Sequence, residues 1–231
     1  MTQSDLSGES RPIASSGPFD VRFADASASE DTEDAALVTS LVEIVNRVYR
    51  ETEADLFLPG VKRTDEAEIS RLAREGLLAV AYGPIPHPHP GQNHRPDQHS
   101  DQQQRPASPK PVGCVYVKQL SPTLGNFGML AIDAEHQGGG LGRAMVRFAE
   151  EHCRDKGCTV MQLELLVPAT SEHAFKSRMQ AWYQRMGYRL VKLGNFNQDY
   201  PDLAPRLAGP AEYRVFEKHL AQEPAIDVST W

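Results

Sequence analysis

Four of the five residues from Gly138 to Gly142 are glycine, and an amphipathic helical pattern follows them directly. The first amides of a helix have no partner within the helix, and the helix dipole adds about half a positive charge at that end. Because glycine has no side chain, an anion can approach these amides closely. The sequence therefore predicts a phosphate or pyrophosphate site at residues 137–143.

The spacing of these glycines excludes two common nucleotide-binding motifs. In the dinucleotide motif G-x-G-x-x-G, the third glycine would fall at Arg143 or at Met145. The P-loop motif fails as well, because no Gly-Lys-Ser/Thr follows the glycines. The pattern present is Gln137-x-x-Gly140-x-Gly142, placed after an expected strand and at the start of an expected helix.

One acidic residue, Glu164, interrupts the apolar run TVMQLELLV at residues 159–167. Burying a carboxylate among apolar side chains is costly unless it serves a purpose. One purpose is general-base catalysis, in which the carboxylate takes a proton from a reacting amine. An edge contact or a structural ion pair is the alternative.

Helical and strand periodicities alternate around these residues. The predicted strands are 19–24, 77–82, 112–120, 127–132, 159–167 and the segments YRLVKL and AEYRVFEKHL. The predicted helices are 34–49, a segment capped by the Thr64 hydroxyl, the segment that follows the glycines up to Gly157, and one whose buried stripe is Phe175, Met179, Trp182 and Met186. This order predicts a single α/β or α+β domain with a mixed sheet.

Three segments are expected to lie outside the packed domain, which we place at residues 19–223. Residues 1–18 and 224–231 are predicted tails, and 84–111 is a predicted disordered insertion with hardly any apolar side chains. The insertion carries four histidines that could hold a metal ion, namely His87, His89, His94 and His99. Prolines between them favour a solvated linker, so we expect no metal site.

Composition limits the classes of partner. The formal net charge is −7 at pH 7, which argues against a general nucleic-acid binder. The first residues lack the apolar core of a signal peptide, and no run reaches the roughly 18 apolar residues of a membrane helix. We therefore expect a cytoplasmic monomer or homodimer that binds neither nucleic acid nor membranes.

Two motifs together resemble those of the GNAT acetyltransferase superfamily. The first is LAIDAEHQGGGLGRAM, which contains the pattern Arg/Gln-x-x-Gly-x-Gly/Ala in a strand-loop-helix context. The second is AWYQRMGY at 181–188, similar to the family's aromatic-Tyr-x-x-x-Gly-aromatic segment. The resemblance covers roughly residues 19–220 apart from the insertion. It implies a mixed, mostly antiparallel sheet flanked by helices.

The resemblance also implies the co-substrate and its contacts. The phosphates at the glycines would belong to acetyl-CoA, and the backbone of Leu130, Ala131 and Ile132 would pair with its pantetheine arm. The phosphate contacts would be those of the glycine segment, namely Gln137, Gly138, Gly139, Gly140, Leu141, Gly142 and Arg143.

Two residues are the candidates for chemistry by the same resemblance. Glu164 would accept the amine proton, with Asp133 in reserve, and Tyr183 would protonate the departing thiolate. Packing is the alternative role for Tyr183. One departure from the family is Lys176, which stands where the family often has asparagine; we expect it, or Arg178, to reach a CoA phosphate.

The acceptor would be a primary amine of a small molecule or peptide. We expect Tyr49, Glu53 and Tyr200 to contact it, with Asp55, Asp199 and Asp202 close by. Acidic and aromatic residues suit a cationic or aromatic amine, although such residues are also common on surface loops. The alternative function is a catalytically silent protein that binds acyl-CoA as a sensor or serves as an interaction protein.

Overall fold

The computed structural model describes residues 19–24, 32–83 and 109–220. Its strands are β1 (Asp20–Phe23), β2 (Leu78–Tyr82), β3 (Pro111–Ser121), β4 (Leu124–Ile132), β5 (Val160–Pro168), β6 (Arg189–Leu193) and β7 (Ala211–His219). Its helices are α1 (Thr32–Thr52), α2 (Glu66–Arg74), α3 (Leu141–Asp155), α4 (Ala174–Arg185) and the short α5 (Phe196–Asp199), with 3-10 turns η1 (Ala134–His136) and η2 (Ala204–Arg206).

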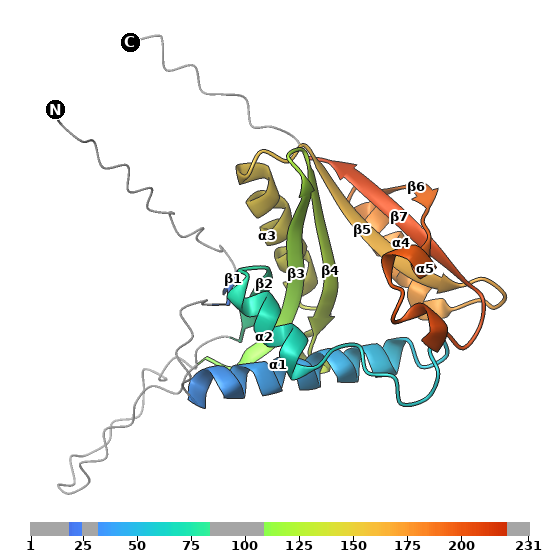
Figure 1. The fold of residues 1–231 in the computed structure, drawn as a ribbon. Coiled ribbons are helices and arrows are strands. Elements are labelled where there is room, and N and C mark those ends of the chain that lie inside the picture. Colours follow the sequence, from blue (N-terminus) through green and yellow to red (C-terminus); the bar gives the residue numbers. More distant parts are fainter. Residues whose placement is uncertain (1–18, 25–31, 84–108, 221–231) are drawn as a thin grey trace, which may run out of the picture.

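The strands form one sheet in the order β1-β2-β3-β4-β5-β7-β6 (Figure 1). Every neighbouring pair is antiparallel except β4 and β5, which are parallel. A parallel pair needs a crossover connection, and α3 supplies it. The predicted mixed, mostly antiparallel sheet with flanking helices is confirmed.

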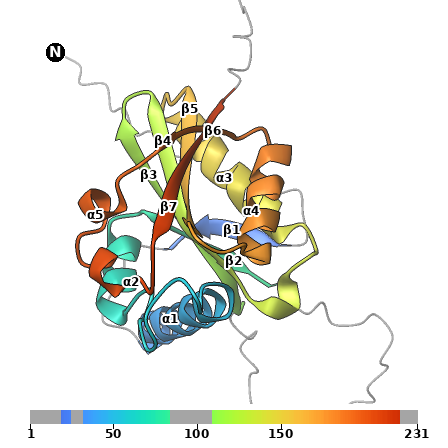
Figure 2. The ribbon, with the colours of Figure 1, turned by 90° about the vertical axis from the view of Figure 1, so that its right-hand side faces the viewer.

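Helices cover both faces of this sheet (Figure 2). Leu78 and Val80 of β2 pack in the cluster formed with α1 and α2, whereas Ala79 and Ala81 pack in the cluster formed with α3. This alternation is the two-residue period of a strand buried on both faces. It explains why the predicted strand 77–82 is apolar throughout.

The sheet is split between β4 and β5. Their parallel register includes only Leu124 with Val160, Gly125 with Met161 and Asn126 with Gln162. Beyond these pairs the two strands separate, although each continues for several residues (Figure 1). Among the strands that the structure describes, none therefore neighbours the β5-facing edge of β4 from residue 127 onward.

Two sequence predictions about the helices are wrong in detail. The cap of α2 is Asp65 rather than Thr64, since the Asp65 carboxylate accepts from the Glu68 amide at 2.8 Å. The Thr64 hydroxyl instead donates to the Glu68 side chain at 2.8 Å. In α4 the predicted stripe is only partly buried, and the fully buried side chains are Lys176 and Tyr183. Both face the split in the sheet, as described below.

Several predicted segments lie outside the described residues. They are the tails 1–18 and 224–231 and nearly all of the insertion, including its four histidines. The insertion's last predicted residue, Pro111, is the first residue of β3, and the Gly83 amide donates to the Lys110 carbonyl at 3.0 Å. In the described part of the chain, no helix has the length and apolar character needed to cross a membrane.

Candidate active site

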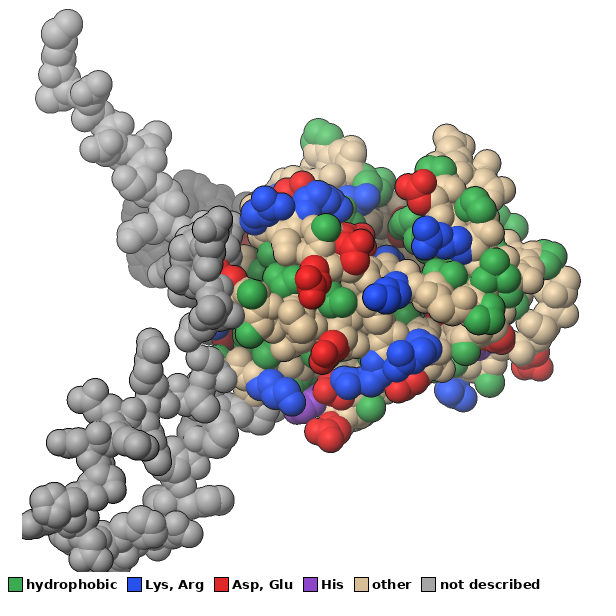
Figure 3. Space-filling view, turned by 60° about the horizontal axis from the view of Figure 1, so that its bottom comes forward, with side chains coloured by type: hydrophobic (Ala, Val, Ile, Leu, Met, Phe, Trp, Pro, Cys, Tyr) green, Lys and Arg blue, Asp and Glu red, His purple; other side chains and the backbone are tan. Residues whose placement is uncertain are grey.

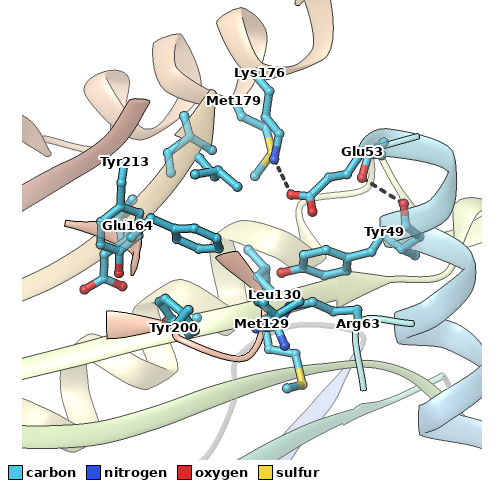
Figure 4. Close-up of a pocket in the computed structure, with 18 of the residues that line it drawn as sticks. Tyr49, Glu53, Arg63, Met129, Leu130, Glu164, Lys176, Met179, Tyr200 and Tyr213 are labelled. Carbon is cyan, nitrogen blue, oxygen red and sulfur yellow. Dashed lines mark hydrogen bonds and ion pairs between the residues drawn. The ribbon is translucent and has the colours of Figure 1, made fainter. Parts of the chain in front are cut away.

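A cavity lies in the split between β4 and β5. We call it the inner cavity; its wall includes Tyr49, Glu53, Leu130, Glu164, Lys176 and Tyr183 (Figure 4). These residues come from α1, β4, β5 and α4, which are distant in sequence. The inner cavity therefore brings together both candidates for chemistry. All three predicted acceptor residues, Tyr49, Glu53 and Tyr200, also lie on its wall.

The glycine segment lies at the start of α3, just after β4. Gly138 and Gly140 have φ of +80° and +87°, a left-handed conformation that residues with a side chain rarely adopt. A Cβ atom placed on Gly138, Gly139 or Gly140 would meet nothing within 4 Å, so the space above this backbone is open. No side chain caps the first amides of α3. Open space above uncapped amides fits a phosphate group.

The neighbours of the glycines have different roles. Gln137 donates from its side chain to the Ile132 carbonyl at 3.0 Å, which ties the glycine segment to the end of β4. Leu141 is buried in the core, so only its backbone is available to a ligand. Arg143 is exposed at the start of α3, where its charge can add to that of the amides.

A bulge shapes β4 where it borders the inner cavity. Cys114 pairs with Ala131 and Tyr116 pairs with Gly128, so one residue of β3 opposes both Met129 and Leu130. Met129 has φ of +49°, a strained value for a residue with a side chain. A bulge leaves one residue outside the regular ladder, so its backbone groups are available to a partner other than β3.

Glu164 is oriented by two amide side chains. Asn126 donates to both carboxylate oxygens at 3.0 and 3.1 Å, and Gln162 donates at 2.6 Å. Asn126 is itself buried. Burial comes first, and the Glu164 carboxylate second, in raising the pKa of Tyr200 and of Tyr213 above the ordinary value for tyrosine. The carboxylate is thus fixed beside two phenols at the edge of the inner cavity.

Tyr183 is more buried than the sequence indicated, with 4% of its surface exposed. Its ring packs edge to face with Tyr188 and tilted against Phe127 and Trp182. Burial, and to a lesser extent the neighbouring Tyr49, raises the pKa of Tyr183 well above its ordinary value. Its hydroxyl is therefore protonated at neutral pH.

Lys176 does not extend toward a phosphate site as expected. It is buried, with 3% of its surface exposed, and its ammonium group pairs with the Glu53 carboxylate (Figure 4). This ion pair joins the start of α4 to the end of α1. Glu53 borders the inner cavity, as expected for an acceptor contact, but its carboxylate is already paired with the Lys176 ammonium group.

A second cavity adjoins the first on the face of the sheet covered by α2. This outer cavity is bounded by α2, by β3 and by the loop before β7, and it shares with the inner cavity Arg63, Gly128, Met129, Glu164, Tyr200 and Leu203. On the face of the molecule that Figure 3 shows, basic and acidic side chains are interspersed. Glu164 is thus accessible from both cavities.

The remaining predicted residues are placed as follows. Asp202 lies on the wall of the outer cavity, whereas Asp55 is 3.1 Å from the His173 ring and, like Asp199, borders neither cavity. Asp133, the reserve base, forms an ion pair with Arg47 of α1 at 3.1 Å and also borders neither cavity. Among the described residues, no cluster of histidine, cysteine and acidic side chains could hold a metal ion.

Three residues of the site, Gln162, Asn126 and Arg63, were not predicted from the sequence. Gln162 could have been found, because it lies two residues before Glu164 and therefore on the same face of one strand. Asn126 could not, because its approach depends on the register between β4 and β5. Arg63 belongs to a loop with no recognisable motif.

Comparison with protein families supports the resemblance seen in the motifs. The model described as an acetyltransferase (GNAT) domain matches residues 106–190, which include the glycine segment, Glu164 and Tyr183. A search of curated proteins finds no match.

Solved structures with this fold include several acetyltransferases. Ard1 from Thermoplasma volcanium is 14% identical, with a TM-score of 0.52 over 89% of this chain and 100% of that one. An aminoglycoside 6'-N-acetyltransferase solved with coenzyme A is 12% identical, with a TM-score of 0.53 over 84% and 96%. The NatC complex bound to Gag peptide and CoA is 16% identical, with a TM-score of 0.51 over 88% and 99%. At these identities the similarity is one of fold.

Proposed function

We propose that the protein is an N-acetyltransferase that uses acetyl-CoA, because the model described as an acetyltransferase (GNAT) domain matches residues 106–190. The acceptor is the primary amine of a small molecule or peptide, and transfer is direct within a ternary complex. The observation that carries the proposal is the position of the inner cavity. It lies in the split beside β4, just before the uncapped start of α3, and holds Glu164 and Tyr183 on its wall.

Binding of the co-substrate is assigned to backbone groups. The amides at 138–143 hold the pyrophosphate, with Arg143 as an added cation, and the free edge of β4 at 130–132 pairs with the pantetheine arm. When bound, acetyl-CoA supplies an acetyl thioester. The bulge at Met129 offers a backbone amide that can donate to the thioester carbonyl oxygen as charge develops there.

Proton transfers are assigned to two side chains. An amine with a pKa near 10.4 is almost fully protonated at pH 7, so it must lose a proton before it attacks the thioester carbon. Glu164, held by Asn126 and Gln162, accepts that proton directly or through water. As the carbon–sulfur bond breaks, the Tyr183 hydroxyl donates its proton to the thiolate. The second proton of the nitrogen returns to the tyrosinate through water, so the products are the amide and free CoA, and the proton held by Glu164 is released to solvent.

The test is CoA release, followed with a thiol reagent, over a broad set of amines, amino acids and short peptides. With the acceptor found in this way, Tyr183→Phe should lower kcat by about 10², while the dissociation constant of acetyl-CoA changes only a few-fold. Glu164→Gln should lower the rate at neutral pH and regain part of it at high pH, where more of the amine is already deprotonated.

A matched control is Tyr188→Phe. Tyr188 belongs to the same aromatic cluster, but its hydroxyl donates to Glu150 at 2.7 Å and it does not border the inner cavity. This change should lower stability rather than kcat. An unchanged kcat in Tyr183→Phe, with chemistry shown to be rate-limiting, would remove the assignment of the acid. Acetyl-CoA binding without CoA release for any amine would favour the silent sensor instead.

A further inference from the structure

The outer cavity has an unusual balance of charge for this protein. The whole chain carries a formal net charge of −7, yet five basic and four acidic side chains border this cavity. The basic residues are Lys62, Arg63, Arg71, Lys118 and Arg206, and the acidic ones are Asp65, Glu68, Glu164 and Asp202.

Most of the acidic side chains are already engaged by the protein. Asp65 caps α2, Glu68 accepts from the Thr64 hydroxyl at 2.8 Å, and Glu164 accepts from two amide side chains. Asp202 lies at the exposed rim. These hydrogen bonds fix the carboxylates in place without neutralising them, and of the four acidic side chains only Glu164 also borders the inner cavity, where it can receive a cation.

The basic side chains, in contrast, are mostly without acidic partners. Arg71 pairs with Glu75 at 2.9 Å, but none of the other four forms an ion pair with any residue that the structure describes. Arg63 lies 5.2 Å from the centre of the Tyr49 ring, and Lys118 lies 5.4 Å from that of Tyr116. Aromatic faces hold these cations in place. Burial alone would lower the pKa of Arg63, but the nearby Tyr49 and Glu68 raise it, so the guanidinium group stays charged.

Arg63 occupies the central position among these cations. It borders both cavities, and Figure 4 shows it beneath Tyr49 and beside Met129, with Glu164 and Tyr200 on the opposite side of the pocket. A guanidinium group can donate two parallel hydrogen bonds to a carboxylate or phosphate. Glu164, with Tyr200 and Tyr213 beside it, can receive a positively charged amine.

We propose that the acceptor is an amine that also carries an acid group, with its amine at Glu164 and its acid group at Arg63. Lys118 and Arg206 add positive charge around the acid group. This inference rests on the proposed acetyl transfer, and it narrows the acceptor from amines in general to acidic amines such as amino acids and amine phosphates.

The experiment compares matched acceptors in the CoA-release assay. One set consists of amino acids, their carboxamides and the corresponding decarboxylated amines; the other pairs O-phosphoethanolamine with ethanolamine. The two sets distinguish a carboxylate from a phosphate as the acid group. We expect the acidic member to have a kcat/KM at least about tenfold higher than its neutral counterpart in one set or both. A carboxamide has a less basic amine than its parent acid, so a preference for the acid does not reflect easier deprotonation.

Variants then test the assignment to Arg63. Arg63→Gln should reduce the preference for the acidic member about tenfold, mainly through KM, and Arg206→Gln, whose side chain is exposed, should reduce it less. The matched control is Arg74→Gln, an exposed arginine of α2 that does not border either cavity, which should leave the preference unchanged. Circular dichroism checks that each variant is folded.

The outcomes separate the two proposals. If neutral amines are acetylated at least as well as acidic ones, or if Arg63→Gln and Arg206→Gln both keep the full preference, the inference about the acid group is wrong and the transferase proposal stands. If no amine releases CoA from protein that binds acetyl-CoA, the transferase proposal fails and the inference fails with it.

Discussion

The buried ion pair between Lys176 and Glu53 gives a stability prediction that needs no ligand. The Lys176 side chain is 4% exposed and that of Glu53 is 11% exposed, so each charge depends on the other. Replacing Glu53 by leucine leaves the ammonium group buried and unpaired, which should cost about 3–5 kcal/mol. A loss of about 3 kcal/mol lowers the folding equilibrium constant more than 100-fold. For a domain of this size it should lower Tm by about 6–12 °C.

The double variant Glu53→Leu with Lys176→Met removes both charges. Apolar side chains of similar volume can replace a buried ion pair with little loss, so the double variant should lie within about 1 kcal/mol of the wild type. The coupling free energy from the cycle should then be about 3 kcal/mol or more. The assay is urea unfolding without ligand, followed by fluorescence and by circular dichroism to check for two-state behaviour.

A second cycle on Arg71 and Glu75 provides the control. These residues form an ion pair one turn apart on α2, but their side chains are 51% and 45% exposed. Water screens such a pair, so its coupling should be only about 0.3–0.5 kcal/mol. Equal couplings for the two pairs would show that water reaches Lys176 and Glu53, and would refute the argument from burial.

Two further predictions concern the glycine segment and the half-buried His152. The φ of Gly139 is not positive and the space above its backbone is open, so Gly139→Leu should fold normally but weaken acetyl-CoA binding at least about tenfold by calorimetry. Gly209→Leu, at an equally open site elsewhere, should leave binding unchanged. Undiminished binding in Gly139→Leu would show that the phosphate site lies away from these glycines. Burial lowers the pKa of His152 from 6.5 to about 4, so the unfolded chain binds more protons than the folded one and stability should fall as the pH drops from 6.5 to 4. His152→Phe, which keeps a ring against Phe23, should lose part of this pH dependence in urea titrations, and His219→Gln should retain it; identical pH profiles for wild type and His152→Phe would contradict the shift.

Features set by neighbouring residues were predictable from the sequence. The glycine segment, the helix that follows it and the apolar strand β2 each depend on a local pattern. The cap of α2 was misplaced by one residue, because Thr64 and Asp65 are both good capping residues and only the backbone conformation decides between them. Local patterns therefore predicted the elements, with boundary errors, and the phosphate site stays a prediction.

Contacts between distant segments were not predictable in the same way. Lys176 and Glu53 are 123 residues apart, and nothing in either local pattern indicates that α4 meets the end of α1. Periodicity found the side of α4 that packs against the core, through Met179, Trp182 and Met186, but it missed the more deeply buried Lys176 and Tyr183, because it cannot show that a helix covers a split in the sheet as well as its strands. Tyr183 borders that split and is buried by its ring contacts with Phe127 and Tyr188.

The single parallel pair explains why the predicted phosphate site and the reacting groups lie at one place. The strands β4 and β5 run in the same direction and pair only at their first residues, so the split opens toward their carboxyl ends. The crossover helix of such a unit must begin near the carboxyl end of its first strand, and the amides of α3 therefore lie beside the opening. Glu164 lies on β5 two residues beyond its last pair with β4, at the point where the strands separate. Strand direction and an incomplete register thus bring the start of α3 and Glu164 to the same split in the sheet, where we propose the anion site and the base.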